Sequence, residues 1–162
     1  MGEDSYQQTR SFFYVIRDKL EVVRINEQYT GEYGCVIWPS ADALARIIAN
    51  NESFFATSRV LELGCGPGLP GIVAAKCGSR VFLSDLKDPE CILENCRANC
   101  KQNHVESTSC VVDLFIHPHS WLPLRWGHIT EEWMTIGPVD VVIGADLFYD
   151  SKRFLLACCI LS

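Results

Sequence analysis

A glycine-rich turn between two acidic residues is the part of this sequence best suited to chemistry. Glu62 precedes the turn, Gly64, Gly66 and Gly68 form it, and Asp85 follows 21 residues after Gly64. Glycines let a ligand approach the backbone because no Cβ intrudes, and the first N–H groups of a following helix are free to bind it. A carboxylate about 20 residues further on is placed to accept hydrogen bonds from a ribose. These residues together predict a site for a nucleoside-containing cofactor.

The spacing of the glycines separates two classes of cofactor. Dinucleotide sites use the pattern G-x-G-x-x-G. Here the third place of that pattern falls on Leu69, and the third glycine is Gly68. The G-x-G-x-G form is typical of S-adenosylmethionine sites, where the ligand brings an ammonium and a sulfonium instead of a pyrophosphate. Glu62 would attract an ammonium and repel a pyrophosphate. The pattern therefore favours S-adenosylmethionine, and an NAD-dependent oxidoreductase is the less favoured alternative.

Strands and helices alternate around this turn. The expected strands are apolar on both faces, which is typical of a parallel sheet covered by helices, as in α/β proteins. Ser40 is expected to cap the first helix and Gly78 to end the second. The third strand has an alternative position at residues 122–126. The expected strands are residues 59–63, 80–84, 110–115 and 139–143, and the expected helices are residues 41–50, 69–77, 89–102 and 151–160.

Two segments ahead of the sheet predict a β-hairpin. Residues 12–16 and 19–25 are rich in β-branched and aromatic residues, and Arg17 and Asp18 between them are expected to form the turn. We expect residues 1–33 to form this N-terminal extension and residues 34–162 to form the cofactor-binding domain.

Composition narrows the function classes. The net charge of −6 argues against a nucleic-acid-binding surface, which needs clustered Lys and Arg. No apolar run reaches the roughly 18 residues needed to span a membrane. The nine cysteines do not form the two CxxC pairs that a zinc site needs, so we expect no metal site. We expect the cysteines to be reduced, buried thiols.

Four ordered segments resemble the family-sixteen protein methyltransferases, which are the non-SET lysine methyltransferases and their relatives. Within that family the sequence is most similar to the methyltransferase-like proteins of subgroup twenty-three, through the runs EVVRI, LPGI-x-AAKCG and LRWGHI. The four segments are residues 34–41 (GCVIWPSA), 61–72 (LELGCGPGLPGI), 124–127 (LRWG) and 146–149 (DLFY).

The resemblance implies a Rossmann-like seven-β-strand methyltransferase fold with S-adenosyl-L-methionine as cofactor. It also implies lysine or arginine side chains of a protein, such as a histone or a chaperone, as acceptors in the cytoplasm and nucleus. Each matched position then has an implied role. Trp38 would line the pocket entrance. Three parts of the cofactor would be bound: the methionine end by Glu62, Gly64, Gly66 and Gly68, the ribose by Asp85, and the adenine by stacking on Trp126. Asp146 and Tyr149 would be catalytic residues where the methyl group is transferred.

The sequence departs from the family in two places. Residues 113–121 are interpreted as an insertion, which leaves open whether Asp113 or Trp126 ends the third strand. The sequence also ends at Ser162, shortly after the fourth of the seven expected strands. We therefore expect a sheet truncated after its fourth parallel strand, weakly folded and prone to aggregate. A catalytically inactive form that binds only cofactor or partner proteins is the alternative to an active enzyme.

Overall fold

A parallel sheet forms on the segments that are apolar on both faces. The computed structural model describes residues 6–31, 33–85, 91–105, 110–111, 122–123 and 136–147. Strands β3 (Arg59–Leu63), β4 (Arg80–Asp85), β5 (Cys110–Val111) and β7 (Val141–Gly144) lie in the order β5-β4-β3-β7. Every pairing in this sheet is parallel. The predicted α/β class with a parallel sheet is confirmed.

Both predicted positions for the third strand pair with β4. Cys110 and Val111 lie beside Val81 and Phe82, and the short strand β6 (Leu122–Pro123) lies beside Ser84 and Asp85. The described structure thus contains two short partners of β4, one behind the other along its edge. Asp113 and Trp126 lie outside the described residues, so the end of the third strand stays a prediction.

The helices confirm one predicted cap and correct another. Helix α3 (Leu69–Cys77) ends at Gly78, whose φ of 110° is the left-handed conformation expected of a glycine cap. Helix α1 (Pro39–Asn50) begins one residue before Ser40, so the prediction that Ser40 caps it is wrong. The N-cap is Trp38, without a side-chain hydrogen bond, and Pro39 begins the helix because its fixed φ and missing N–H suit the first position.

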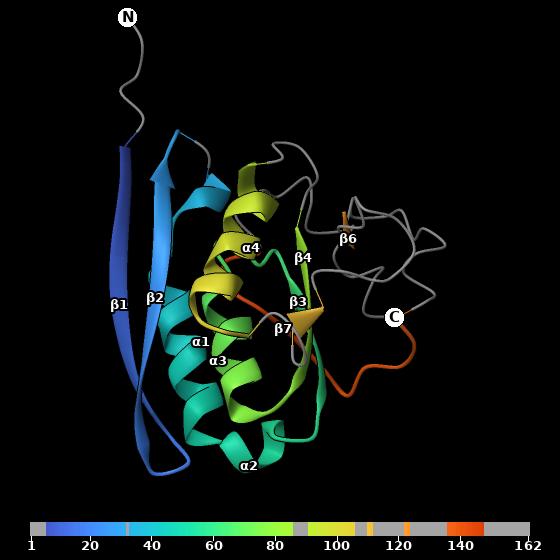
Figure 1. The fold of residues 1–162 in the computed structure, drawn as a ribbon. Helices are drawn as coiled ribbons and strands as arrows, with labels where there is room; N and C mark the ends of the chain where they lie inside the picture. Colours follow the sequence, from blue (N-terminus) through green and yellow to red (C-terminus); the bar gives the residue numbers. More distant parts are fainter. Residues whose placement is uncertain are drawn as a thin grey trace, which may run out of the picture.

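The remaining helical segments are α2 (Glu52–Phe55), α4 (Cys91–Gln102) and the 3-10 helix η1 (Tyr33–Cys35). The sequence patterns did not predict α2 or η1, each of which is about one turn long. The helix predicted for residues 151–160 lies outside the described residues. In Figure 1, helices α1, α3 and α4 lie between the sheet on one side and the N-terminal strands on the other.

The predicted hairpin is confirmed and is longer than expected. Strands β1 (Tyr6–Ile16) and β2 (Lys19–Tyr29) are antiparallel and joined by Arg17 and Asp18. Both turn residues have positive φ, 52° and 58°, as a two-residue turn between twisted strands requires. The inner face of the hairpin belongs to the same buried cluster as α3 and β4. The division at residue 33 stays a prediction. The inner-face residues are Phe12, Tyr14, Ile16, Val23 and Ile25.

Helix α4 covers the outer edge of β2 with a ladder of asparagines. Asn95 and Asn99 are four residues apart on one face of α4, and Asn103 follows at the same spacing directly after the helix ends. Asn99 accepts from the backbone N–H of Asn26 (2.8 Å), and its amide donates to the carbonyl of Asn26 (3.2 Å). Asn103 makes the same pair of bonds with the backbone of Arg24, at 3.0 and 2.7 Å. Side-chain amides thus satisfy the strand edge as a third strand would.

Candidate functional site

The predicted site lies where the strand order changes direction. Strand β4 lies on one side of β3 and β7 lies on the other. Ligands of open α/β sheets bind in the crevice at the carboxyl ends of such strands. The glycine turn follows β3, Asp85 ends β4, and Asp146 comes two residues after the end of β7. The structure therefore brings these three sequence-predicted features to one edge of the sheet.

The glycine turn depends on left-handed backbone and on close approach. Gly64, Gly66 and Gly68 have φ of 60°, 51° and 89°, and Gly68 is the N-cap of α3. A Cβ on Gly66 would lie 3.2 Å from the carbonyl oxygen of Gly34, and one on Gly68 would lie 2.8 Å from the sulfur of Cys96. Side chains at these two positions would therefore strain the backbone and displace neighbours.

Asp85 is bonded to the glycine turn itself. The backbone N–H of Gly66 donates to its Oδ2 at 2.7 Å. Asp85 is half-buried at the end of β4. Its carboxylate therefore holds the glycine turn, which follows β3, to the neighbouring strand β4. A second bond, from the N–H of Cys65 to the carbonyl of Ser84 (2.9 Å), holds the start of the turn to the same strand. The ribose contact implied for Asp85 stays a prediction, and its link to the turn is an additional function that the structure shows.

Glu62 lies beneath the turn and links β3 to α3. Its side chain is buried, at 1% exposure, and its Oε2 accepts from the N–H of Gly71 at 2.8 Å. Burial raises the pKa of this carboxyl well above its ordinary value, although the Gly71 bond lowers it in part. A Cβ on Gly71 would lie 2.5 Å from the same oxygen. The contact with the methionine end of the cofactor stays a prediction for Glu62.

Sequence reasoning missed Gly71, although a signal for it exists. Glycine inside a helix costs about 1 kcal/mol relative to alanine, so its presence indicates a close packing contact. Here that contact is with Glu62 and with Leu83 of β4.

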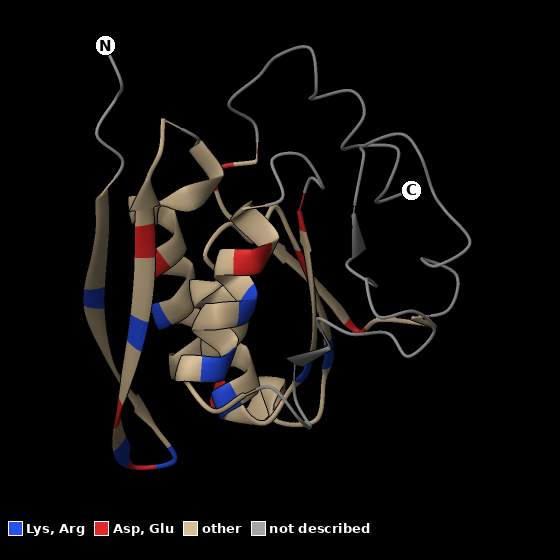
Figure 2. Cartoon of the chain, turned by 45° about the horizontal axis from the view of Figure 1, so that its top comes forward, with Lys and Arg blue, Asp and Glu red and all other residues tan. Residues whose placement is uncertain are grey.

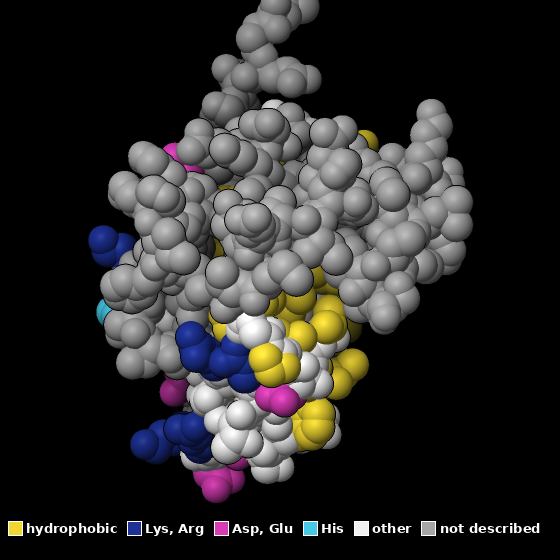
Figure 3. Space-filling model, turned by 90° about the vertical axis from the view of Figure 1, so that its right-hand side faces the viewer, with side chains coloured by type: hydrophobic (Ala, Val, Ile, Leu, Met, Phe, Trp, Pro, Cys, Tyr) yellow, Lys and Arg dark blue, Asp and Glu magenta, His cyan; other side chains and the backbone are white. Residues whose placement is uncertain are grey.

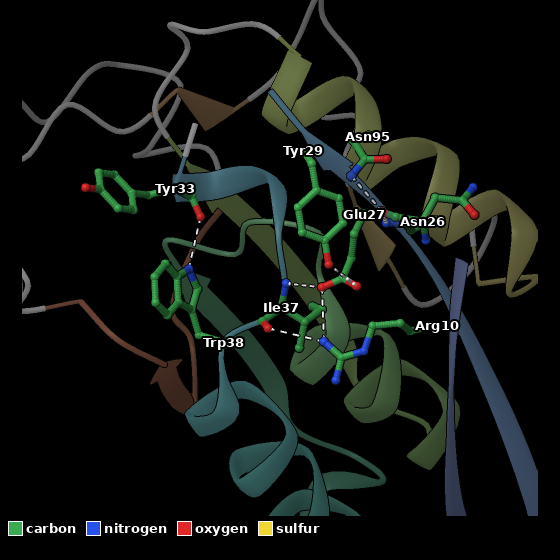
Figure 4. Close-up of polar contacts among 9 residues, drawn as sticks. Arg10, Asn26, Glu27, Tyr29, Tyr33, Ile37, Trp38 and Asn95 are labelled. Atoms are coloured by element: carbon green, nitrogen blue, oxygen red, sulfur yellow. Dashed lines mark hydrogen bonds and ion pairs between the residues drawn. The ribbon is translucent and has the colours of Figure 1, made fainter. Parts of the chain in front are cut away.

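Trp38 lies at the end of a segment that borders the turn. Its indole Nε1 donates to the carbonyl of Tyr33 at 3.0 Å, and the two rings are 6.1 Å apart between centroids (Figure 4). The Trp38 side chain is 43% exposed, so it remains available to a ligand. Four residues before it, Gly34 meets Gly66, which places this segment beside the glycine turn. The role of Trp38 at the pocket entrance stays a prediction.

Asp146 is joined to the start of helix α1. The Ser40 hydroxyl donates to its Oδ2, and Asp146 itself has a left-handed backbone with φ of 52°. Ser40 is therefore a residue of the site, whereas the sequence alone indicated a helix cap. Trp126 and Tyr149 lie outside the described residues, so their implied roles stay predictions.

The thiols behind the turn are un-ionised. The Cys65 and Cys96 sulfurs are 3.7 Å apart, and neither cysteine forms a disulfide. The hydrogen bond with Cys96 lowers the pKa of the Cys65 thiol, but burial and the nearby acidic groups of Asp85 and Glu62 together raise it to about 12. No group of three metal-binding side chains occurs among the described residues. This part of the site therefore contributes packing.

The Lys and Arg residues of the described part are distributed over several elements (Figure 2). On the sheet side, which faces the viewer in Figure 3, hydrophobic side chains border Lys and Arg. Within the described helices, none combines the length and apolarity needed to cross a membrane.

Comparison with known proteins identifies the family. The lysine methyltransferase family matches residues 17–161. The histone-arginine methyltransferase METTL23 of Xenopus laevis is 35% identical over 161 residues, which cover 95% of this chain and 64% of the relative. METTL23 of Homo sapiens is 34% identical over 119 residues, or 73% of this chain and 56% of the relative. The electron transfer flavoprotein beta subunit lysine methyltransferase of Danio rerio is 31% identical over 118 residues, or 73% of this chain and 39% of the relative.

These relatives are longer than the region they share with this chain, which spans between 39% and 64% of their lengths. The family match nevertheless includes the hairpin turn, the glycine turn, Asp85 and Asp146. It therefore covers every described element of the site. The chain belongs to the lysine methyltransferase family.

Proposed function

We propose that the protein is an S-adenosylmethionine-dependent methyltransferase that modifies lysine or arginine side chains of a protein. The observation that carries this proposal is the G-x-G-x-G turn at the switch point of the sheet, tied by the Gly66 N–H to Asp85. Relatives named for histone-arginine and protein-lysine methylation support a protein acceptor. A histone or chaperone substrate and residence in the cytoplasm and nucleus belong to the same proposal.

The donor set fits the cofactor. Left-handed glycines bring the backbone close to the proposed ligand position at the N-terminus of α3. Asp85 at the end of β4 suits the ribose hydroxyls, and Trp38 offers a partly exposed aromatic face. When bound, the cofactor would supply an electrophilic methyl group on its sulfonium, to which the acceptor nitrogen would bond as the sulfur leaves as a thioether.

The chain's own residues orient the acceptor. A lysine or arginine must present a nitrogen lone pair to the methyl carbon, so it must first lose a proton. Asp146 is the carboxylate best placed to orient a cationic side chain, and Ser40 fixes its position. Tyr149 would shape the channel around that side chain. Holding the acceptor in line is the main contribution the protein makes to such a displacement.

The cofactor is tested by calorimetry of the intact protein with S-adenosylmethionine, with its demethylated product and with NAD. We expect binding of the first two and none of NAD. Binding of NAD in preference to the methyl donor would overturn the proposal.

The acceptor is tested by incubating the protein with tritium-labelled methyl donor and a cell extract. We expect label that protease removes and nuclease leaves, recovered after hydrolysis as methyl-lysine or methylarginine. Label that nuclease removes and protease leaves would assign a nucleic-acid acceptor instead.

A further inference from the structure

A buried carboxylate on the hairpin points toward the site from outside the sheet. Glu27 of β2 has 0% exposure, and a buried charge requires partners. Its Oε1 accepts from the backbone N–H of Ile37 (2.7 Å) and from Nη1 of Arg10 (3.1 Å). The hydroxyl of Tyr29 lies 3.4 Å from its Oε2 (Figure 4).

Ile37 is bound at both of its backbone groups. Its N–H donates to Glu27 of β2, and its carbonyl accepts from Nη1 of Arg10 of β1 at 3.5 Å. The two hairpin strands thus hold one residue of the chain through an ion pair that they share. We call this arrangement the Arg10–Glu27 clamp.

The clamped residue lies in the middle of a segment that borders the site on two sides. Three residues before Ile37, the carbonyl oxygen of Gly34 would lie 3.2 Å from a Cβ on Gly66 of the glycine turn, and a Cβ on Gly34 would lie 2.5 Å from Ile92 of α4. Directly after Ile37 comes Trp38, and Ser40 two residues later binds Asp146. A shift of Ile37 would therefore move the contacts to the turn and to Asp146 together.

We propose that Glu27 is a positioning residue for the cofactor site, which holds residues 33–38 against the glycine turn through Ile37. The proposal rests on the proposed function, because it concerns the same cofactor. Residues that are held in place before a ligand arrives do not have to be ordered on binding, so the clamp strengthens affinity by preorganisation. The hairpin then supports the cofactor site through its two hydrogen bonds with Ile37.

The same strand supplies a matched control. Glu21 of β2 also forms an ion pair with a neighbouring element, since Nζ of Lys76 in α3 lies 3.0 Å from its Oε2. This bond joins β2 to α3, whereas the bonds of Glu27 and Arg10 join the hairpin to Ile37. Glu21→Ala therefore removes a carboxylate from the same strand without releasing Ile37.

The experiment compares Glu27→Ala, Glu27→Gln and Glu21→Ala in the intact protein. Three quantities are measured: Kd for S-adenosylmethionine by calorimetry, hydrogen exchange of the Ile37 amide, and Tm without cofactor. We expect Glu27→Ala to raise Kd about tenfold, the equivalent of about one hydrogen bond, and to speed exchange at Ile37. Glu27→Gln keeps an oxygen that accepts from the Ile37 N–H, so it should restore most of the affinity, and Glu21→Ala should leave Kd unchanged.

Arg10→Ala keeps the test decisive if Glu27→Ala does not fold. The Arg10 side chain is 43% exposed, and its loss releases the Ile37 carbonyl while the core stays filled. A raised Kd in a folded Arg10→Ala variant supports the clamp, and an unchanged Kd overturns it. Wild-type protein that fails to bind the methyl donor would instead overturn the proposed function. Wild-type binding that Glu27→Ala leaves unchanged would overturn the positioning role alone.

Discussion

The two acidic residues beside the glycine turn have different surroundings and therefore different roles. Glu62 is buried under the turn and bonded to Gly71, so it links β3 to α3 inside the fold. Asp85 is half-buried at the turn and bonded to Gly66, beside the place proposed for the ribose. Glu62 therefore acts mainly on the fold, whereas Asp85 fixes the turn and is the carboxylate that we propose for the ribose.

Asp85→Ala should weaken binding of S-adenosylmethionine by about 1–3 kcal/mol, the scale for losing a charged hydrogen-bonding partner. The loss has two sources, since the variant releases both the ribose and the Gly66 N–H. Asp85→Asn keeps an oxygen that can accept from Gly66 and should lose less. Calorimetry measures both variants, and equal affinity of wild type and Asp85→Ala would contradict the assignment.

Glu62→Gln should alter the pH dependence of stability. Because burial raises its pKa above the ordinary 4.5, the folded state keeps a proton that the unfolded chain has released. The stabilisation from protonated Glu62 is complete below that value and is lost as the pH rises toward the raised pKa. Glutamine keeps an acceptor for Gly71 and cannot ionise, so the variant avoids this loss. Urea unfolding between about pH 4 and pH 8 measures the free energy of unfolding of both proteins, and the stability of the variant relative to wild type should increase as the pH rises. A difference in stability that does not change with pH would contradict this.

At the scale of elements, the asparagine ladder joins helix α4 to two other parts of the molecule. Asn99 bonds both backbone groups of Asn26 in β2, and its Nδ2 also donates to the carbonyl of Pro67 in the glycine turn at 3.0 Å. Helix, hairpin and turn therefore meet at a single buried side chain.

Asn99→Ala should lower the free energy of unfolding by about 1–3 kcal/mol, because it leaves buried backbone groups without their partners. Lys101→Ala is the control, since Lys101 lies on the exposed face of the same helix. Denaturant unfolding of both variants measures the difference. If Asn99→Ala lowers the free energy of unfolding no more than Lys101→Ala does, water can replace the hydrogen bonds of the asparagine ladder.

At the scale of the molecule, one hydrophobic core joins the hairpin to the sheet. Ile25 of β2 and Leu83 of β4 belong to the same buried cluster, with α3 between them. The hairpin and the parallel sheet should therefore unfold as one unit.

Ile25→Ala should lower the free energy of unfolding by about 2–5 kcal/mol, the cost of a cavity in a packed core. The transition should stay single, and the β3 and β4 amides should lose protection together with the hairpin. Leu20→Ala, at a side chain that is 67% exposed, is the control and should have little effect. Two separate transitions would show that the hairpin is an independent unit.

Local signals in the sequence determined most of the elements and the glycine turn. Residues 59–63 and 80–84 are short, mainly apolar runs, Gly78 follows a helix, and Arg17 and Asp18 occupy a two-residue turn, so each prediction required only neighbours in the chain. The same holds for the glycine turn, because its spacing and its backbone conformation are properties of five consecutive residues.

Tertiary structure alone decided which side chains support that site. Ser40 and Asp146 are 106 residues apart, Asn26 and Asn99 are 73 apart, and Glu27 and Ile37 meet only because the hairpin folds against residues 33–38. Even Glu62 and Gly71 depend on how α3 crosses β3. Such contacts are absent from sequence patterns because a buried polar group accepts any geometrically suitable donor, and the packing of distant elements decides which donor arrives.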